Sequence, residues 1–152
     1  MKIKVVSLEL NKKYEIELDI ESEIIYEIDI AERFFALELG KNNVENVGLL
    51  CLDFNNRILN YSNLAIGTIE NVKVSISQLC KCALLSNASK VIVAHNHPDG
   101  CLKITDEDIS MTRSIAAALK IFSIKLLDSI IVNSEGKAVS IRQSIKEIPN
   151  CE

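Results

Sequence analysis

The sequence predicts an α/β domain in which a mixed β-sheet is covered by about three helices. Two observations support this class: helix patterns alternate with short apolar strands, and the 152 residues are 48% apolar and 25% charged. A chain of this length buries roughly 70% of the surface that its unfolded form exposes, so its core needs no disulfide or structural metal. The expected order is strand, strand, helix, strand, strand, helix, strand, helix, strand, strand.

An N-terminal β-hairpin is expected before the first helix. Residues 13–20 alternate between apolar and polar side chains, as a strand does when one of its faces is buried. The preceding residues also have strand character, and Asn11 with Lys12 suits the turn. We therefore expect residues 2–20 to form a hairpin within an N-terminal extension that covers residues 1–27.

Three pairs of polar residues have the spacing of helix N-terminal signals. They are Asp29 with Glu32, Ser75 with Gln78, and Thr105 with Asp108. The first pair predicts a helix of about ten residues that ends near Gly40. The other two pairs precede apolar residues at helical spacing, so each predicts an amphipathic helix.

Apolar runs between these helices predict the strands of the sheet. They cover residues 45–53, 57–62, 90–98, 126–132 and 138–141. Asn55 with Asn56 turns the chain between the first two strands, and Gly136 lies in the turn between the last two. Residues 143–152 are expected to be a loosely held C-terminal tail.

Charge and cysteine content limit the classes of function. The formal charge is −4, and no basic stretch is interleaved with aromatic residues, so the composition does not support nucleic-acid binding. No apolar stretch is long enough to span a membrane, and the N-terminus lacks the form of a signal peptide. Five cysteines without a secretory signal favour free thiols in the cytoplasm. No pattern indicates an oligomeric state.

The two histidines of the chain, His95 and His97, stand two positions apart at the end of a predicted strand. Alternate residues of a strand point to the same face, so both imidazoles can reach one point. Without a third histidine, a metal held there needs a carboxylate or a thiolate. Asp108, in the first turn of the next helix, is favoured over Cys101 in the intervening loop. Two imidazoles and a carboxylate leave one position on Zn²⁺ open for water, as in catalytic zinc sites.

These residues resemble the JAMM metal motif of JAB/MPN-type metallopeptidases, in which His-x-His and a later Asp hold zinc. More narrowly, the motifs HNHPDG, TDED and LLDSIIV of this sequence resemble HNHPSG, SxED and LLDHIIV, which are the usual motifs of the RadC-like branch. The resemblance covers residues 28–142 and implies a cytidine-deaminase-like JAB/MPN fold. It also implies a short bacterial form that lacks the helix-hairpin-helix region of longer RadC proteins.

The resemblance implies roles for individual positions. His95, His97 and Asp108 correspond to the zinc ligands. Glu45 corresponds to the carboxylate that takes a proton from the zinc-bound water. Thr105 replaces a serine that helps to hold the ligand Asp or the developing oxyanion.

The function implied by this resemblance is zinc-dependent hydrolysis of a peptide or isopeptide bond, with a peptide or protein as substrate. The alternative is a RadC-like binding or regulatory module without catalysis, associated with DNA repair or mobile elements. Two other zinc families do not fit. Gly100 stands where the metallo-β-lactamase pattern HxHxDH requires a histidine, and the H-x-E and P-C-x-x-C patterns of zinc deaminases are missing. Asp99 and Ser129 stand where RadC-like proteins usually have Ser and His.

Overall fold

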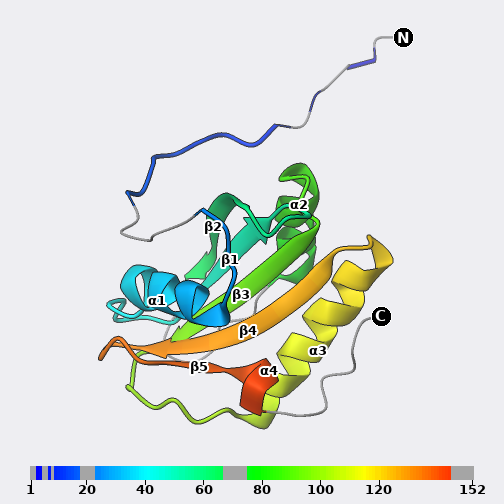
Figure 1. The fold of residues 1–152 in the computed structure, drawn as a ribbon. Helices are drawn as coiled ribbons and strands as arrows, with labels where there is room; N and C mark the ends of the chain where they lie inside the picture. Colours follow the sequence, from blue (N-terminus) through cyan, green and yellow to red (C-terminus); the bar gives the residue numbers. More distant parts are fainter. Residues whose placement is uncertain (1–2, 5–6, 8, 18–22, 67–74, 145–152) are drawn as a thin grey trace.

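The computed structural model describes residues 3–4, 7, 9–17, 23–66 and 75–144. Its helices and strands follow in the order α1 (Ile28–Leu39), β1 (Asn46–Leu52), β2 (Ile58–Ile66), α2 (Ile76–Leu85), β3 (Lys90–His97), α3 (Asp106–Ile121), β4 (Lys125–Asn133), β5 (Ala138–Ser140) and α4 (Ile141–Ser144). The strands form one sheet in the order β2-β1-β3-β4-β5 (Figure 1). β3 and β4 are parallel and the other neighbours are antiparallel, which confirms the predicted α/β class with a mixed sheet.

Helices cover both faces of this sheet (Figure 1). α2 and α3 pack on one face, over alternate residues such as Leu49 of β1 and Val93 of β3. α1 packs on the opposite face, where Phe34 and Phe35 share a core with Ile92 and its neighbours. Successive residues of β1 and β3 therefore enter different cores. This is why both strands appear in the sequence as nearly continuous apolar runs.

The turn between β1 and β2 is the predicted one. Asn56 has a φ of 65°, a left-handed conformation that asparagine tolerates better than most residues. Asp53 Oδ1 accepts hydrogen bonds from the backbone N–H groups of Asn55 at 2.8 Å and of Arg57 at 2.9 Å. These bonds close the turn that returns the chain antiparallel to β1.

Two of the three predicted helix N-termini are confirmed. Ser75 caps α2 by accepting a backbone N–H, and Thr105 forms a reciprocal capping box with Asp108 at the start of α3. The prediction that Asp29 caps α1 is wrong, because the N-cap is Glu27, whose side chain makes no capping bond. Asp29 lies in the first turn instead, where its charge suits the positive end of the helix. α1 is held mainly by the apolar face that it packs on the sheet.

Gly40 ends α1, as predicted, and lets the helix end approach β4 closely. A Cβ atom at this position would lie 2.5 Å from the carbonyl oxygens of Ala36 and Asn133. The chain from Gly40 to β1 therefore starts close to the C-terminal end of β4.

The N-terminal hairpin expected over residues 2–20 is not formed by the part of that segment that the structure describes. Residues 9–17 carry no strand pairing and extend away from the sheet (Figure 1). Residues 2, 5, 6, 8 and 18–20 lie outside the described residues. Tyr14 is 70% exposed, so the apolar side of the alternating pattern buries little surface. A two-stranded hairpin without a covering layer is only marginally stable, which is the physical reason for the difference.

Residues 23–25 do join the sheet, beside the start of β2. Ile24 forms an antiparallel bridge with Arg57, and the N–H of Ile58 donates to the carbonyl of Glu23 at 2.8 Å. Ile25 is buried in the core under α1. The segment before α1 is therefore anchored at its C-terminal end. A domain boundary at residue 27 stays a prediction.

The two strands predicted near the C-terminus, over residues 126–132 and 138–141, are present as β4 and β5. β4 and β5 are joined through Gly136, whose φ is 77°. α4 includes the first two residues of the tail expected over 143–152, and residues 145–152 lie outside the described residues. None of the described helices is long and apolar enough to cross a membrane.

Candidate metal centre

β3 delivers both histidines to one face of the sheet. His95 and His97 are alternate residues at the C-terminal end of the strand, so their side chains leave it on the same side. His95 is opposite Val47 of β1 and Ile131 of β4, and it is fully buried. The His97 side chain is 17% exposed. One imidazole is thus enclosed and the other reaches the surface.

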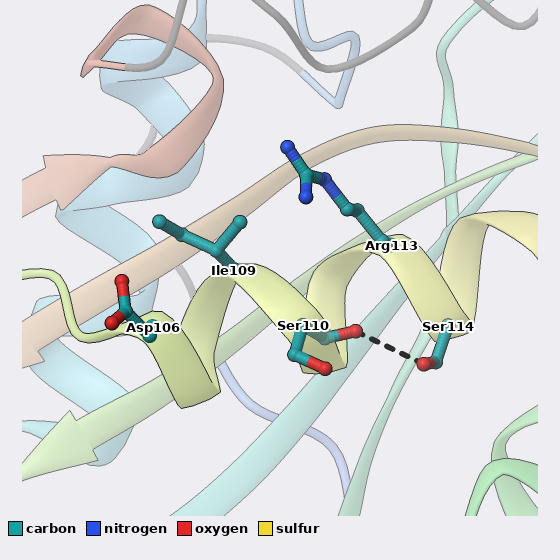
Figure 2. Close-up of a pocket in the computed structure, with 5 residues that line it drawn as sticks. All are labelled: Asp106, Ile109, Ser110, Arg113 and Ser114. Carbon is teal, nitrogen blue, oxygen red and sulfur yellow. Dashed lines mark hydrogen bonds between the residues drawn. The ribbon is translucent and has the colours of Figure 1, made fainter.

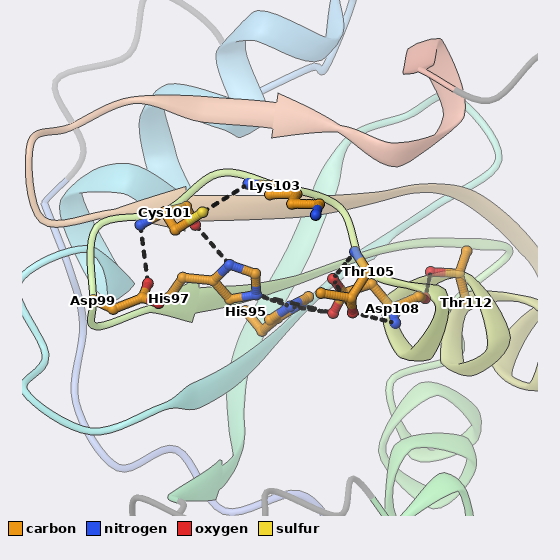
Figure 3. A network of polar contacts seen from close by, with 8 residues as sticks. All are labelled: His95, His97, Asp99, Cys101, Lys103, Thr105, Asp108 and Thr112. Atoms are coloured by element: carbon orange, nitrogen blue, oxygen red, sulfur yellow. Dashed lines mark hydrogen bonds and ion pairs between the residues drawn. The ribbon is translucent and has the colours of Figure 1, made fainter.

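α3 brings a carboxylate to the same point. Asp108 is the third residue of the helix, and its Oδ2 accepts hydrogen bonds from the backbone N–H and the hydroxyl of Thr105, both at 2.8 Å (Figure 3). The backbone N–H of Asp108 donates in return to Thr105 Oγ1 at 3.2 Å. The capping box therefore fixes the carboxylate, while Oδ1 faces the histidines.

Three potential ligand atoms converge at this point. Asp108 Oδ1 lies 3.0 Å from His95 Nε2 and 3.9 Å from His97 Nε2. The two Nε2 atoms lie 3.1 Å apart. Within the described residues, His95, His97 and Asp108 form a group whose ligand atoms all lie within 4.8 Å of one another. Two imidazole nitrogens and one carboxylate oxygen are a donor set that suits zinc, so the residues present fit such an ion.

The loop after β3 orients His97. His97 Nδ1 lies 2.7 Å from the carbonyl oxygen of Cys101, and donating to this oxygen leaves Nε2 free to bind a metal. The Cys101 N–H donates to Asp99 Oδ1 at 2.9 Å, and Cys101 Sγ accepts the Lys103 N–H at 3.4 Å (Figure 3). The Cys101 thiol is thus engaged within its own loop. Of the two candidates for the third ligand, the structure brings Asp108 to the histidines.

The charges around the site favour an ionised Asp108. Burial by itself raises the pKa of this carboxyl, but hydrogen bonds from His95, His97 and Thr105 outweigh burial and hold the pKa well below its usual range. The hydrogen bond with Asp108 raises the pKa of His97 against the opposing effect of burial, and the charge of Glu45 adds to the rise. A site that stabilises positive charge beside a fixed carboxylate is suited to hold a cation.

Glu45 lies directly before β1, and its side chain is partly buried. Val47 is opposite His95 in the antiparallel register of β1 and β3, and continuing this register leads from Val47 to Glu45 and from His95 to His97. The effect of the Glu45 charge on His97 agrees with this placement. Spacing within the sequence gave no signal for Glu45, which was identified through the family resemblance alone.

A pocket of about 490 Å³ lies on the surface of α3 but does not include the candidate metal ligands. Figure 2 shows its lining residues, which are Asp106, Ile109, Ser110, Arg113 and Ser114. These positions recur at helical spacing along one side of α3, whereas the buried Asp108 and Thr112 belong to the side that faces the sheet. The pocket and the candidate metal centre therefore lie on different sides of the same helix.

Comparison with known proteins identifies the family. Residues 25–146 match the family described as the RadC-like JAB domain. A UPF0758 protein of Acinetobacter baumannii is 34% identical over 103 residues, which are 68% of this chain and 44% of that protein. A UPF0758 protein of Marinomonas sp. is 32% identical over 136 residues, 90% of this chain and 60% of that protein. One of Neisseria meningitidis serogroup B is 33% identical over 123 residues, 81% of this chain and 54% of that protein.

The chain therefore spans about half the length of the curated relatives it matches. The region that matches the family contains β1 to β5, the helices that cover the sheet and every residue of the candidate metal centre. The chain belongs to the RadC-like JAB domain family.

Proposed function

We propose that this protein is a zinc-dependent hydrolase of JAMM type that cleaves peptide or isopeptide bonds. The observation that carries the proposal is the convergence of His95 Nε2, His97 Nε2 and Asp108 Oδ1 at the end of β3. Three protein ligands leave one coordination position of zinc open, which is the arrangement of catalytic rather than structural zinc sites. Membership of the RadC-like JAB domain family supports the proposal, because JAB-domain proteins include hydrolases.

The proposed chemistry assigns a task to each residue of the site. Zinc, when bound, lowers the pKa of a coordinated water towards about 7 and polarises the carbonyl group that is attacked. The Glu45 carboxylate accepts a proton from the attacking water and passes it to the leaving nitrogen as the C–N bond breaks. Its position directly before β1, and the effect of its charge on His97, support this role.

Thr105 is assigned a positioning role. Its hydroxyl hydrogen is donated to Asp108 Oδ2, so the side chain holds the ligand carboxylate in place. The family resemblance allows either holding the ligand Asp or stabilising the oxyanion, and this hydrogen bond favours the first. The ligand carboxylate is consequently oriented before a metal arrives.

The substrate class and the location are part of the same proposal. We expect a peptide or protein substrate in the cytoplasm. Cys51, Cys80, Cys82 and Cys101 are free thiols, which suits a reducing compartment. The association of RadC-like proteins with DNA repair stays a prediction, because a formal charge of −4 gives no support for direct contact with nucleic acid.

The test compares zinc-loaded wild-type protein with Glu45→Gln on a library of linear peptides and lysine-linked isopeptides. We expect the variant to keep about one zinc per chain and to lose at least about 100-fold in kcat, because the general base is missing. Glu17→Gln, an exposed carboxylate outside the site, serves as the matched control and should behave as wild type.

Two results would count against the proposal. Unchanged turnover in Glu45→Gln would remove Glu45 from the role of base. Zinc-loaded wild-type protein that cleaves none of the peptides and isopeptides would contradict hydrolysis itself and favour the non-catalytic binding module.

A further inference from the structure

Asn96 lies between the two histidines on β3, but its side chain enters the opposite face of the strand. It is fully buried. Its Oδ1 accepts the backbone N–H of Asn46 at 2.6 Å, and its Nδ2 donates to the carbonyl oxygens of Asn42 at 3.1 Å and Val44 at 3.0 Å. The amide thus uses its acceptor and both of its donors on one short segment, the connection between α1 and β1.

These three bonds surround Glu45. Val44 and Asn46 are its neighbours in the chain, and both are bonded to Asn96 through their backbone. Residues 41–45 belong to no helix or strand, so the usual backbone ladder does not fix them. The Asn46 side chain adds one local bond, from Nδ2 to the Val44 carbonyl at 2.8 Å. The position of Glu45 therefore depends strongly on the Asn96 amide.

We infer that Asn96 is a positioning residue that couples the general base to the metal ligands. Its backbone belongs to the strand segment that carries His95 and His97, and its side chain holds the segment that carries Glu45. One residue thereby fixes the distance between the carboxylate and the two imidazoles. This inference rests on the proposed function, in which Glu45 is the base.

The chemistry of the side chain explains why asparagine is required. The segment presents one N–H donor and two carbonyl acceptors to the Asn96 amide. Without the amide, the Val44 carbonyl keeps its bond from Asn46 Nδ2, whereas the partly buried Asn42 carbonyl loses its side-chain donor, which costs free energy. Asparagine supplies one acceptor and two donors in a fixed plane. Aspartate can accept the Asn46 N–H but has no hydrogen for either carbonyl, and serine is too short to serve all three groups.

The test uses Asn96→Asp, with Asn96→Ser as a second variant if the first fails to fold. Hydrogen–deuterium exchange should rise in residues 41–47. The zinc content should stay at about one per chain, because the side chains of His95 and His97 project from the opposite face of the strand. The kcat should fall about 10- to 100-fold with little change in KM, as is typical when a group that supports a site residue is lost. Val132→Thr, a buried change near Asn96 on the same face of the sheet, is the matched control and should leave exchange in 41–47 unchanged.

A double-mutant cycle with Glu45→Gln separates positioning from general destabilisation. If Asn96 acts through Glu45, adding Asn96→Asp to Glu45→Gln should lower the residual turnover by less than about twofold. A loss as large as in the wild-type background would overturn the inference. Unchanged exchange in residues 41–47 would also overturn it, and that measurement needs no substrate. A wild-type protein without hydrolytic activity would refute the proposed function but would leave the exchange result to decide whether Asn96 fixes this segment.

Discussion

Asp108 of α3 and Asp128 of β4 are both buried, but their oxygens are bonded differently. Asp128 Oδ1 accepts the backbone N–H groups of Ser129 at 2.7 Å and Arg142 at 3.2 Å, and its Oδ2 accepts the hydroxyl of Ser140. Both oxygens are thus held by neutral donors. Asp108 has one oxygen held by Thr105, whereas the other faces two imidazoles.

The difference appears in the ionisation of the two carboxyls. Burial raises the pKa of Asp128, and its hydrogen bonds from Ser140, Arg142 and Ser129 offset only part of the rise. The pKa of Asp108 is instead lowered, because the bonds from His95, His97 and Thr105 outweigh burial. A buried carboxylate enclosed by neutral donors connects parts of the fold, whereas one that keeps an oxygen directed at two imidazoles can bind a cation.

The largest expected effect is the loss of metal from Asp108→Ala. Removing a ligand should weaken zinc binding by more than about 100-fold, since the loss of a supporting partner alone costs about 10- to 100-fold. Zinc per chain is measured after dialysis, and circular dichroism checks that the fold is kept. Asp106→Ala, an exposed carboxylate on the outer side of α3, is the matched control. Equal zinc content in Asp108→Ala and wild-type protein would contradict the ligand assignment.

Asp128→Ala should affect stability and leave the metal bound. Two backbone N–H groups and one hydroxyl lose their acceptor, so the free energy of unfolding should fall by about 3 kcal/mol. Urea denaturation gives this value, and the zinc content of the folded variant should equal that of wild type. Loss of zinc from a folded Asp128→Ala would remove the distinction between the two aspartates.

Thr105→Ala should have a smaller effect on the same site. The carboxylate of Asp108 loses a hydroxyl donor but keeps the Thr105 backbone N–H, so zinc affinity should fall about tenfold. Loss of the cap should lower stability by about 1 kcal/mol. Thr105→Ser keeps the hydroxyl and should retain the zinc affinity and the stability of wild type. Competition with a zinc chelator measures the affinity, and urea denaturation measures the stability. Wild-type affinity in Thr105→Ala would show that the hydroxyl does not position the ligand.

The pH dependence of stability in the metal-free protein gives the smallest effect. The lowered pKa of Asp108 contributes stability that is present above the ordinary carboxyl pKa of about 4 and is lost as the pH falls below it. The raised pKa of Asp128 has the opposite sign, because its ionisation opposes folding and protonation relieves that opposition as the pH falls.

Urea denaturation between about pH 7 and pH 3 can separate these contributions. The stability of wild type relative to Asp108→Asn should decrease as the pH falls below about 5, where His97 is already protonated, and that relative to Asp128→Asn should increase on acidification. Changes of the same sign would contradict the contrast between the two carboxyls.

Most of the fold could be predicted because its signals are local. The capping residues Ser75 and Thr105, the turn at Asn56 and the apolar runs of the central strands act within a few residues of themselves. The alternating pattern of residues 13–20 is equally local, but a strand also needs a neighbour, and no sequence pattern supplies one. The N-terminal prediction fails at that step, at least within residues 13–17, the part of the pattern that the structure describes.

The candidate metal centre was predictable only in part for the same reason. His95, His97 and Asp108 lie on consecutive elements, so strand alternation and a helix cap bring them together. Glu45 and Asn96 depend on the register between β1 and β3, which joins residues about fifty positions apart. The position of Asn96 between the two histidines is plain from the sequence. Its hydrogen bonds to Asn42, Val44 and Asn46 depend on the tertiary structure, and no sequence pattern predicts them.

The most direct test of the central claim is anomalous diffraction at the zinc absorption edge from crystals grown with zinc. A strong peak is predicted between His95 Nε2, His97 Nε2 and Asp108 Oδ1, about 2.0–2.2 Å from each atom. A peak bound by Cys101 Sγ in place of Asp108, or no peak beside the two histidines, would contradict it.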